Sequence, residues 1–176
     1  EPKLKNRVIV LNGVSKAYSM TGWRIGYAAG PKEIIKAMGK LQSQSTSNPT
    51  SISQVAAEAA LRGNQDCIKP MIKAFKERHA FVLQALNEIE GIQCIPANGA
   101  FYAFADARNA IKILFSKNKI SSANDLAFSE FLLDTTGVAI VPGSAFGSEG
   151  YFRISFATSM ENLVEALKRI KNAIEI

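Results

Sequence analysis

The longest regular pattern in the sequence extends from Asp66 to Glu90. Apolar residues recur there at the spacing of one helix face. They are Ile68, Met71, Ile72, Phe75, Val82, Leu83, Leu86 and Ile89. A helix of this length would be roughly 36 Å long, at a rise of about 1.5 Å per residue. That is long for a compact domain, so the pattern predicts a rod that joins two lobes.

The segments that flank this rod predict an α/β chain. Strands are predicted at 7–13, 24–29, 92–95, 100–104, 138–141 and 151–156, and helices at 31–41, 51–61, 106–115, 123–135 and 158–174. The first strand is expected to be buried because its residues are almost all apolar. A Thr158-x-x-Glu161 capping box is expected to start the last helix. The character of the sequence changes after Gly91, and a domain boundary is expected there.

Composition is that of an ordinary soluble globular protein, with 47% hydrophobic and 20% charged residues in 176. The net charge is +6, but the lysines are spread along helices, which favours a solvated surface over a nucleic-acid site. Without a signal peptide or a long uncharged apolar run, a cytoplasmic protein with no membrane contact is expected. Cys67 and Cys94 fit no metal or redox spacing and are expected to be free core thiols, so no metal site is predicted. The only histidine, His79, lies on the apolar stripe and is expected to be partly buried and structural.

Lys16 follows the first predicted strand, and ligands bind at strand ends in open α/β sheets. A single loop lysine is usually a solvated charge, but Arg24 follows it, flanked by Gly22 and Gly26. Such glycines allow a close backbone approach or a positive φ. The lysine amine can act as a nucleophile or base when desolvated, while the arginine fork suits a phosphate. A nucleophilic lysine beside a phosphate-binding arginine is what a pyridoxal phosphate enzyme requires.

The stretch from Ser15 to Tyr27 reads Ser-Lys-x-x-Ser-Met-x-Gly-x-Arg-x-Gly-Tyr. It resembles the cofactor-lysine signature of class I and II aminotransferases, which have fold type I. The resemblance implies that Lys16 forms the internal Schiff base with pyridoxal 5′-phosphate and that Arg24 binds the cofactor phosphate. Many relatives have Ser or Thr where this chain has Gly13. The phosphate site then either has one hydroxyl fewer or uses Ser15 or Ser19 instead.

The chains of this family are much longer, and their signature lysine lies past the middle. The resemblance therefore implies that this chain corresponds to the C-terminal half only. Residues 1–65 would be a remnant of the large α/β/α cofactor-binding domain, 66–90 a long interdomain helix, and 91–176 a small α+β domain. The fragment alone is expected to be inactive, because the other half supplies the carboxylate that faces the pyridine nitrogen, the ring-stacking aromatic residue and a phosphate-binding helix start.

Other positions also resemble the family. Ser47 and Asn48 match a Ser-Asn-Pro segment that reaches the neighbouring subunit's site, which implies a homodimer and makes both residues weak candidates. Ser43 stands where animal aspartate aminotransferases have an arginine for the second substrate carboxylate. The segment 99–102 resembles the aspartate/aromatic aminotransferase subgroup. In relatives, a segment similar to 142–147 lines the mouth of the active site.

Arg153 lies inside the apolar strand 151–156, where an arginine is costly unless it is paired or directed at a ligand. From the strand pattern alone, it could also face outward from a half-exposed sheet. The resemblance implies that its guanidinium binds the substrate α-carboxylate through two parallel hydrogen bonds.

The resemblance implies a transaminase that moves an amino group between an amino acid and a 2-oxo acid. Three alternatives remain open: another fold type I enzyme such as a lyase or decarboxylase, a non-catalytic sensor lobe of a regulator, and a structural fragment without activity. The substrate is equally open among aspartate, aromatic amino acids and prephenate, since fold kinship does not choose among them.

Overall fold

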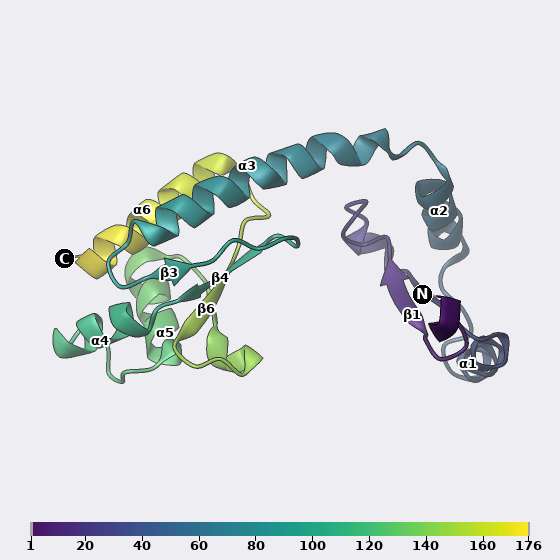
Figure 1. Cartoon of the computed structure of the whole chain (residues 1–176), viewed down its shortest axis with the longest axis horizontal. Helices are drawn as coiled ribbons and strands as arrows, with labels where there is room; N and C mark the ends of the chain where they lie inside the picture. Colours follow the sequence, from purple (N-terminus) through teal and green to yellow (C-terminus); the bar gives the residue numbers. More distant parts are fainter. Residues whose placement is uncertain (1, 176) are drawn as a thin grey trace. The chain divides into compact units, whose positions relative to one another are not determined.

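The structure is a computed structural model that describes residues 2–175. The chain divides into two compact units, residues 1–71 and residues 72–176. The division falls inside α3 (Ile68–Asn87), which is the long helix predicted from the apolar stripe. Figure 1 shows the order of the elements along the chain.

The first unit contains two strands and two helices. Its elements are η1 (Pro2–Leu4), β1 (Val10–Gly13), η2 (Thr21–Trp23), β2 (Gly26–Ala29), α1 (Lys32–Ser45), α2 (Ser51–Arg62) and η3 (Gln65–Cys67). The strands form an antiparallel pair whose register runs from Val10↔Ala29 to Gly13↔Gly26.

The expectation that the first strand is buried is wrong for this unit. Leu11 in β1 is 75% exposed, and large apolar side chains of α1 and α2 are exposed as well. They include Leu41, Ile52 and Val55. A two-stranded sheet with two helices is too small to cover both faces of its own strands, so side chains with the composition of a core remain at the surface.

The second unit is an antiparallel sheet covered by helices. After α3 its elements are β3 (Gln93–Cys94), β4 (Tyr102–Asp106), α4 (Arg108–Ser116), α5 (Asp125–Thr136), β5 (Val141–Pro142), η4 (Gly143–Phe146), β6 (Tyr151–Ser155) and α6 (Met160–Glu175). The strand order is β3-β4-β6-β5.

The core of this unit combines one face of the sheet with the apolar stripes of the helices. Burial alternates along β4 and β6, so that Ala103, Ala105, Phe152 and Ile154 point inward. The Phe128 ring of α5 packs 5.7 Å from the Phe152 ring. The opposite face of the sheet therefore carries the partly exposed residues of the same strands, a consequence of the two-residue period.

Several boundaries differ from the sequence expectations. The strand predicted at 138–141 is reduced to β5, at Val141–Pro142. The last helix is capped one residue later than expected, because the Ser159 hydroxyl, and not that of Thr158, accepts the backbone N–H of Asn162 at 3.3 Å. Within residues 2–175, no helix combines the length and apolar character needed to cross a membrane.

The cysteines and the histidine have separate outcomes. Cys94 is buried, as predicted, and its burial raises the pKa of the thiol. Cys67 is exposed at the end of η3, so its assignment to a core is wrong. His79 is partly buried, as predicted, and has structural partners: its Nε2 accepts the backbone N–H of Ala97 at 3.3 Å, and its ring lies 5.4 Å from Phe156.

Candidate active site

Lys16 lies in the loop of residues 14–25, which joins β1 to β2. Val14 is fully buried at the start of the loop, and its carbonyl accepts the backbone N–H of Tyr18 at 3.2 Å. The Lys16 carbonyl accepts the N–H of Ser19 at 3.3 Å. The chain therefore makes a compact turn, on which Lys16 is exposed and Ser15 is half-buried.

Two side chains tie this loop to the region where α3 begins. The Tyr18 hydroxyl donates to Gln65 Oε1 at 2.7 Å, and the Ser19 hydroxyl donates to Met71 Sδ at 3.3 Å. Gln65 is itself held, because its Nε2 donates to the carbonyls of Ala60 and Gly63 at 3.0 and 2.7 Å. These contacts could not be predicted from the sequence, since the paired residues lie far apart along the chain.

Arg24 stands just outside β2 and not inside the strand predicted at 24–29. It has left-handed backbone angles, φ 51° and ψ 50°, and its Nη1 donates to the Thr21 carbonyl at 3.0 Å. A residue with these angles cannot continue an extended strand. Between Ser15 and Tyr27, the residues with a positive φ are thus Ser19 and Arg24, and not Gly22 or Gly26.

Gly26 serves a different purpose, whereas Gly22 has open space around it. A Cβ added to Gly26 would lie 3.2 Å from the Asn12 carbonyl oxygen, so this glycine permits close contact between β2 and β1. Loop 14–25 therefore presents an amine, a hydroxyl and a guanidinium from Lys16, Ser15 and Arg24. Together these groups can bind an anionic ligand and attack an electrophile.

Ser47 and Asn48 lie between α1 and α2 and are both exposed. Ser47 has a φ of 63°, which is uncommon for a residue with a side chain. They belong to the first unit, as do Lys16, Ser15 and Arg24, whereas Arg153 belongs to the second.

Arg153 occupies β6 and faces away from the core, between the buried residues Phe152 and Ile154. Arg153 therefore faces outward, as the strand pattern allowed, and its side chain also contacts two aromatic rings. Its guanidinium carbon lies 4.2 Å from the centroid of the Tyr102 ring and 4.5 Å from that of Phe146. The resemblance of segment 142–147 placed Phe146 at the mouth of the active site, but contact of either ring with Arg153 was not predicted, although the alternation of β4 does place Tyr102 on the outer face.

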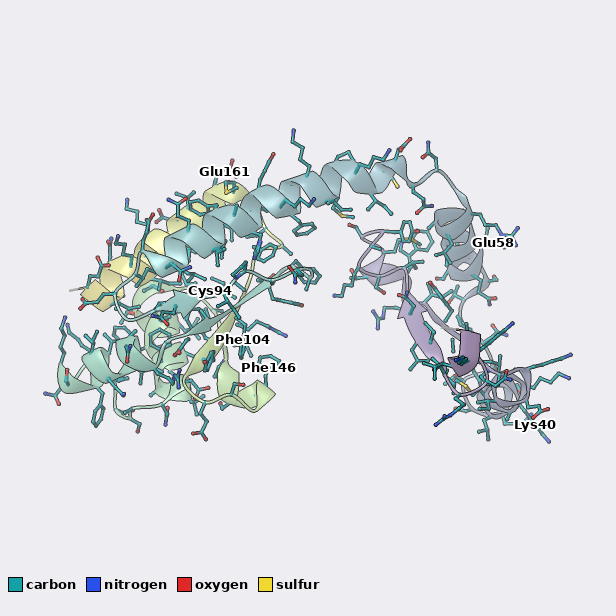
Figure 2. All side chains as sticks on the ribbon, viewed as in Figure 1. Lys40, Glu58, Cys94, Phe104, Phe146 and Glu161 are labelled. Carbon is teal, nitrogen blue, oxygen red and sulfur yellow. The ribbon has the colours of Figure 1, made fainter. Side chains whose placement is uncertain are left out.

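Phe146 belongs to η4, whose position depends on a buried carboxylate. Asp125, at the start of α5, is 2% exposed, and its Oδ2 accepts the backbone N–H of Ser144 at 2.6 Å. Burial alone would raise the pKa of this carboxyl, but hydrogen bonds from Ser144 and from the backbone of Asp125 and Gly150 outweigh it and lower the pKa. The Phe146 ring also meets Phe104 edge to face, with centroids 6.1 Å apart; both residues are labelled in Figure 2.

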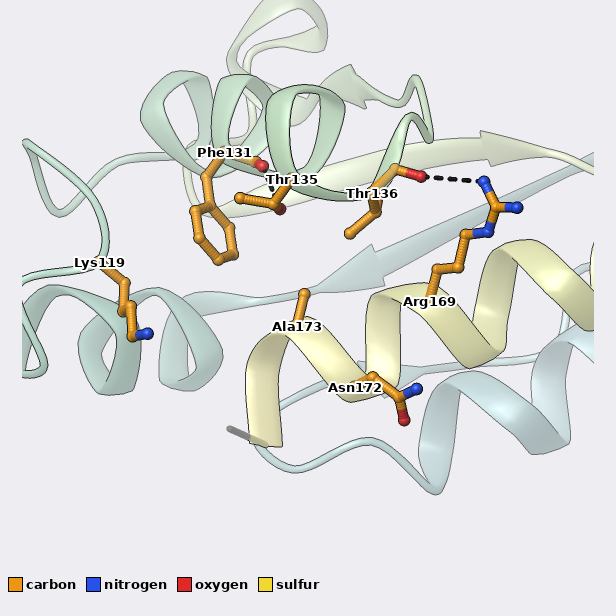
Figure 3. A pocket seen from close by; sticks show the side chains of 7 residues that line it. All are labelled: Lys119, Phe131, Thr135, Thr136, Arg169, Asn172 and Ala173. Carbon is orange, nitrogen blue, oxygen red and sulfur yellow. Dashed lines mark hydrogen bonds between the residues drawn. The ribbon is translucent and has the colours of Figure 1, made fainter.

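A separate pocket of about 510 Å³ lies between α5 and α6 (Figure 3). It is lined by Lys119, Phe131, Thr135, Thr136, Arg169, Asn172 and Ala173. Its arginine is already engaged, because Arg169 donates to the Thr136 carbonyl at 3.2 Å and to Glu165 at 2.7 Å. None of the residues predicted for the active site lines this pocket.

Known proteins resemble this chain over nearly its whole length. The family model of aminotransferase class I and II matches residues 1–170. The chain belongs to this family. The resemblance drawn from the Ser15–Tyr27 signature is thereby confirmed.

Among the aminotransferases of this family, the aspartate/prephenate aminotransferase of Nitrosomonas europaea is 60% identical over 173 residues, which are 98% of this chain and 44% of that protein. The aspartate aminotransferase of Rhizobium meliloti is 51% identical over 176 residues, 99% of this chain and 42% of that protein.

Solved aminotransferase structures share the fold as well. The crystal structure of the aspartate aminotransferase from Rhizobium meliloti matches with a TM-score of 0.90 and 48% identity, over 99% of this chain and 44% of that one. The aromatic aminotransferase from Pyrococcus horikoshii matches with a TM-score of 0.86 and 37% identity, over 97% and 44%. The chain thus spans less than half the length of these relatives, the proportion expected of a C-terminal half.

Proposed function

We propose that this chain is the C-terminal part of an aminotransferase that uses pyridoxal 5′-phosphate to move an amino group between an amino acid and a 2-oxo acid. The observation that carries the proposal is the 60% identity, over 98% of the chain, to a protein named an aminotransferase. That similarity favours transamination over the lyase, decarboxylase and regulator alternatives.

The donor groups of loop 14–25 fit this cofactor. Lys16 offers the amine to which the aldehyde of the cofactor attaches. The Arg24 guanidinium and the Ser15 hydroxyl offer the contacts that the cofactor phosphate needs. When bound, the cofactor supplies the electron sink for the charge that develops at the substrate Cα. The residues of the chain supply attachment, orientation and proton transfer.

Lys16 and Arg153 are proposed to act on the substrate itself. With the cofactor bound, the Lys16 amine would take the proton from the substrate Cα as a general base and, as a general acid, would deliver it to the cofactor carbon C4′ and not back to Cα. Arg153 binds the α-carboxylate through two parallel hydrogen bonds and so fixes the direction of the Cα–H bond. A planar guanidinium suits this task better than a lysine ammonium, which offers no fixed fork.

The proposed enzyme is larger than this chain and is a homodimer. The exposed apolar side chains of β1, α1 and α2 support this, because surfaces of that composition are normally covered in a folded domain. We assign the first unit to the large cofactor-binding domain and the second to the small domain. Ser47 and Asn48, exposed between α1 and α2, are the proposed contacts to the neighbouring subunit's site.

Aspartate is the proposed amino donor. The names of the Nitrosomonas and Rhizobium relatives both include aspartate, and the former also includes prephenate, the oxo acid that we propose as a second substrate. Assays of the full-length enzyme with aspartate, paired with prephenate or 2-oxoglutarate, would rank the two acceptors. Product formation from aspartate without any 2-oxo acid would instead indicate a lyase or decarboxylase.

Replacement of Lys16 tests the catalytic assignment. In the full-length enzyme, Lys16→Ala should lower the transamination rate by about a thousandfold or more. It should also abolish the visible absorbance of cofactor attached to the protein. Lys16→Arg keeps the positive charge but should fail equally, since a guanidinium does not lose its proton. Near-normal turnover by either variant would contradict the role of Lys16.

Replacement of Arg153 tests the carboxylate site. Arg153→Lys should raise the KM for aspartate by about tenfold to a hundredfold, because a fork-to-fork contact is lost while the charge is kept. The dissociation constant of succinate, which retains the carbon chain and both carboxylates of aspartate but has no amino group, should rise in parallel. Unchanged affinity for both compounds would rule out this assignment.

A further inference from the structure

The guanidinium of Arg153 is held by aromatic rings and not by acidic groups. Tyr102 comes from the neighbouring strand β4, and Phe146 comes from the η4 turn. With distances of 4.2 and 4.5 Å from the guanidinium carbon to the two ring centroids, both contacts are well inside the range of a cation–π interaction. We refer to Tyr102 and Phe146 together as the aromatic clamp.

Within residues 2–175, the side chain of Arg153 makes no hydrogen bond or ion pair. By contrast, Arg108 on the same side of the sheet is paired with Asp106 at 2.6 Å, and its guanidinium carbon lies 5.4 Å from the Tyr151 ring. A ring face attracts a cation but does not accept hydrogen bonds from the N–H groups that lie in the guanidinium plane. The clamp can therefore hold Arg153 while its N–H groups remain available to a ligand.

The clamp is itself fixed by the second unit. Phe104 stands opposite Arg153 in the β4–β6 register and meets the Phe146 ring edge to face. The Phe104 ring in turn stacks on Tyr151 at 5.4 Å. At the start of the η4 turn, Asp125 holds the backbone of Ser144. The Phe146 ring is therefore held by contacts other than the one with Arg153, and Tyr102 belongs to strand β4, which pairs with β6.

We infer that Tyr102 and Phe146 are positioning residues for substrate selection: they orient the Arg153 guanidinium so that its donor edge meets the α-carboxylate. The inference rests on the proposed role of Arg153. An arginine without the clamp would lose binding energy in ordering its flexible side chain before each contact with substrate. The clamp makes that ordering part of the folded state, which favours amino acids over amines that lack the α-carboxylate.

The test compares aspartate with β-alanine, which is aspartate without its α-carboxylate, as amino donors for the full-length enzyme. Phe146→Leu and Tyr102→Leu remove one ring each and keep an apolar side chain. Phe146→Tyr and Tyr102→Phe keep the ring and serve as conservative variants. Phe115→Leu removes an exposed ring of α4 and is the matched control. Because Phe146 is 47% exposed, its replacement leaves the core intact.

Each leucine variant should raise the KM for aspartate and the dissociation constant of succinate by about tenfold, which is the range of one partly desolvated cation–π contact. The kcat/KM for β-alanine should remain within about twofold, since β-alanine has no α-carboxylate for Arg153 to bind. The two conservative variants and Phe115→Leu should resemble the unmodified enzyme in all of these measurements.

Two results would overturn the inference. Equal losses with aspartate and β-alanine would mean that the rings only support the fold, and unchanged succinate affinity in both leucine variants would mean that Arg153 is oriented without them. The proposed function fails by a different result, namely unchanged affinity in Arg153→Lys. If Arg153→Lys weakens binding while the leucine variants do not, only the inference about the clamp is lost.

Discussion

Asp125 accepts a 2.6 Å hydrogen bond from the backbone N–H of Ser144, and this bond joins the first turn of α5 to the η4 turn. The carboxylate is almost fully buried, yet its pKa is lowered, because the hydrogen bonds to its charged form outweigh the cost of burial. It therefore holds in place the turn that carries Phe146.

We predict that Asp125→Asn lowers the free energy of unfolding by about 2 kcal/mol at pH 7, since one charge-assisted hydrogen bond in a buried setting is weakened. A carboxyl whose pKa is lower in the folded state contributes stability above its ordinary pKa of 3.8, and the contribution is lost as the pH falls through the folded value. The difference between the two proteins should thus shrink below about pH 4 in urea unfolding followed by circular dichroism. Asp134→Asn, on the exposed side of α5, is the control, and a difference that stays constant down to pH 3 would contradict the prediction.

Gly143, at the start of η4, and Gly147, which follows its end, should differ in their tolerance of alanine. A Cβ on Gly143 would lie 2.7 Å from both the Cβ and the carbonyl oxygen of Tyr151, and these atoms cannot move without shifting β6. Gly147 has a φ of 76° and open space around it. We expect Gly143→Ala to cost about 3 kcal/mol through steric overlap and Gly147→Ala about 1 kcal/mol through backbone strain. Denaturant midpoints would measure both costs, and equal costs would refute the steric argument.

The Tyr18 hydroxyl should hold the lysine loop in place. Tyr18→Phe removes its 2.7 Å bond to Gln65 and should lower the local stability of residues 14–25 by about 1 kcal/mol. Hydrogen–deuterium exchange of this loop should accelerate by about fivefold as a result. Tyr27→Phe, in exposed β2, offers a matched loss of one hydroxyl. Acceleration of the same size in both variants would show that the Gln65 contact contributes nothing specific.

Ser47 is expected to be a site of backbone strain. Its φ of 63° is readily adopted by glycine, so Ser47→Gly should raise the free energy of unfolding by about 0.5 to 1 kcal/mol. Ser45→Gly, at the last position of α1, should shift stability in the opposite direction because glycine is unfavourable within a helix. Thermal unfolding would measure the change in stability of both variants. A loss of stability in Ser47→Gly would count against strain at this position.

Local pattern explains which features could be predicted. The helices can be predicted from the spacing of apolar residues. The helix predicted at 66–90 is α3, which is only slightly shorter at each end. The predictions that failed depend on surroundings. β1 would be buried only by neighbours that this unit does not contain. Arg24 lies outside the strand because its own backbone angles are left-handed. Cys67 is exposed because it lies at the end of a surface turn.

The sequence by itself determined the family, because the Ser15–Tyr27 signature is continuous along the chain and does not depend on contacts between distant segments. Only the tertiary structure decided how Arg153 is held. Its ring partners come from β4 and η4, and the turn that carries one of them is fastened by Asp125 of α5. Contacts of this kind join residues that are distant in the chain, and they arise from the pairing of strands and the packing of helices, which no spacing within a single segment encodes.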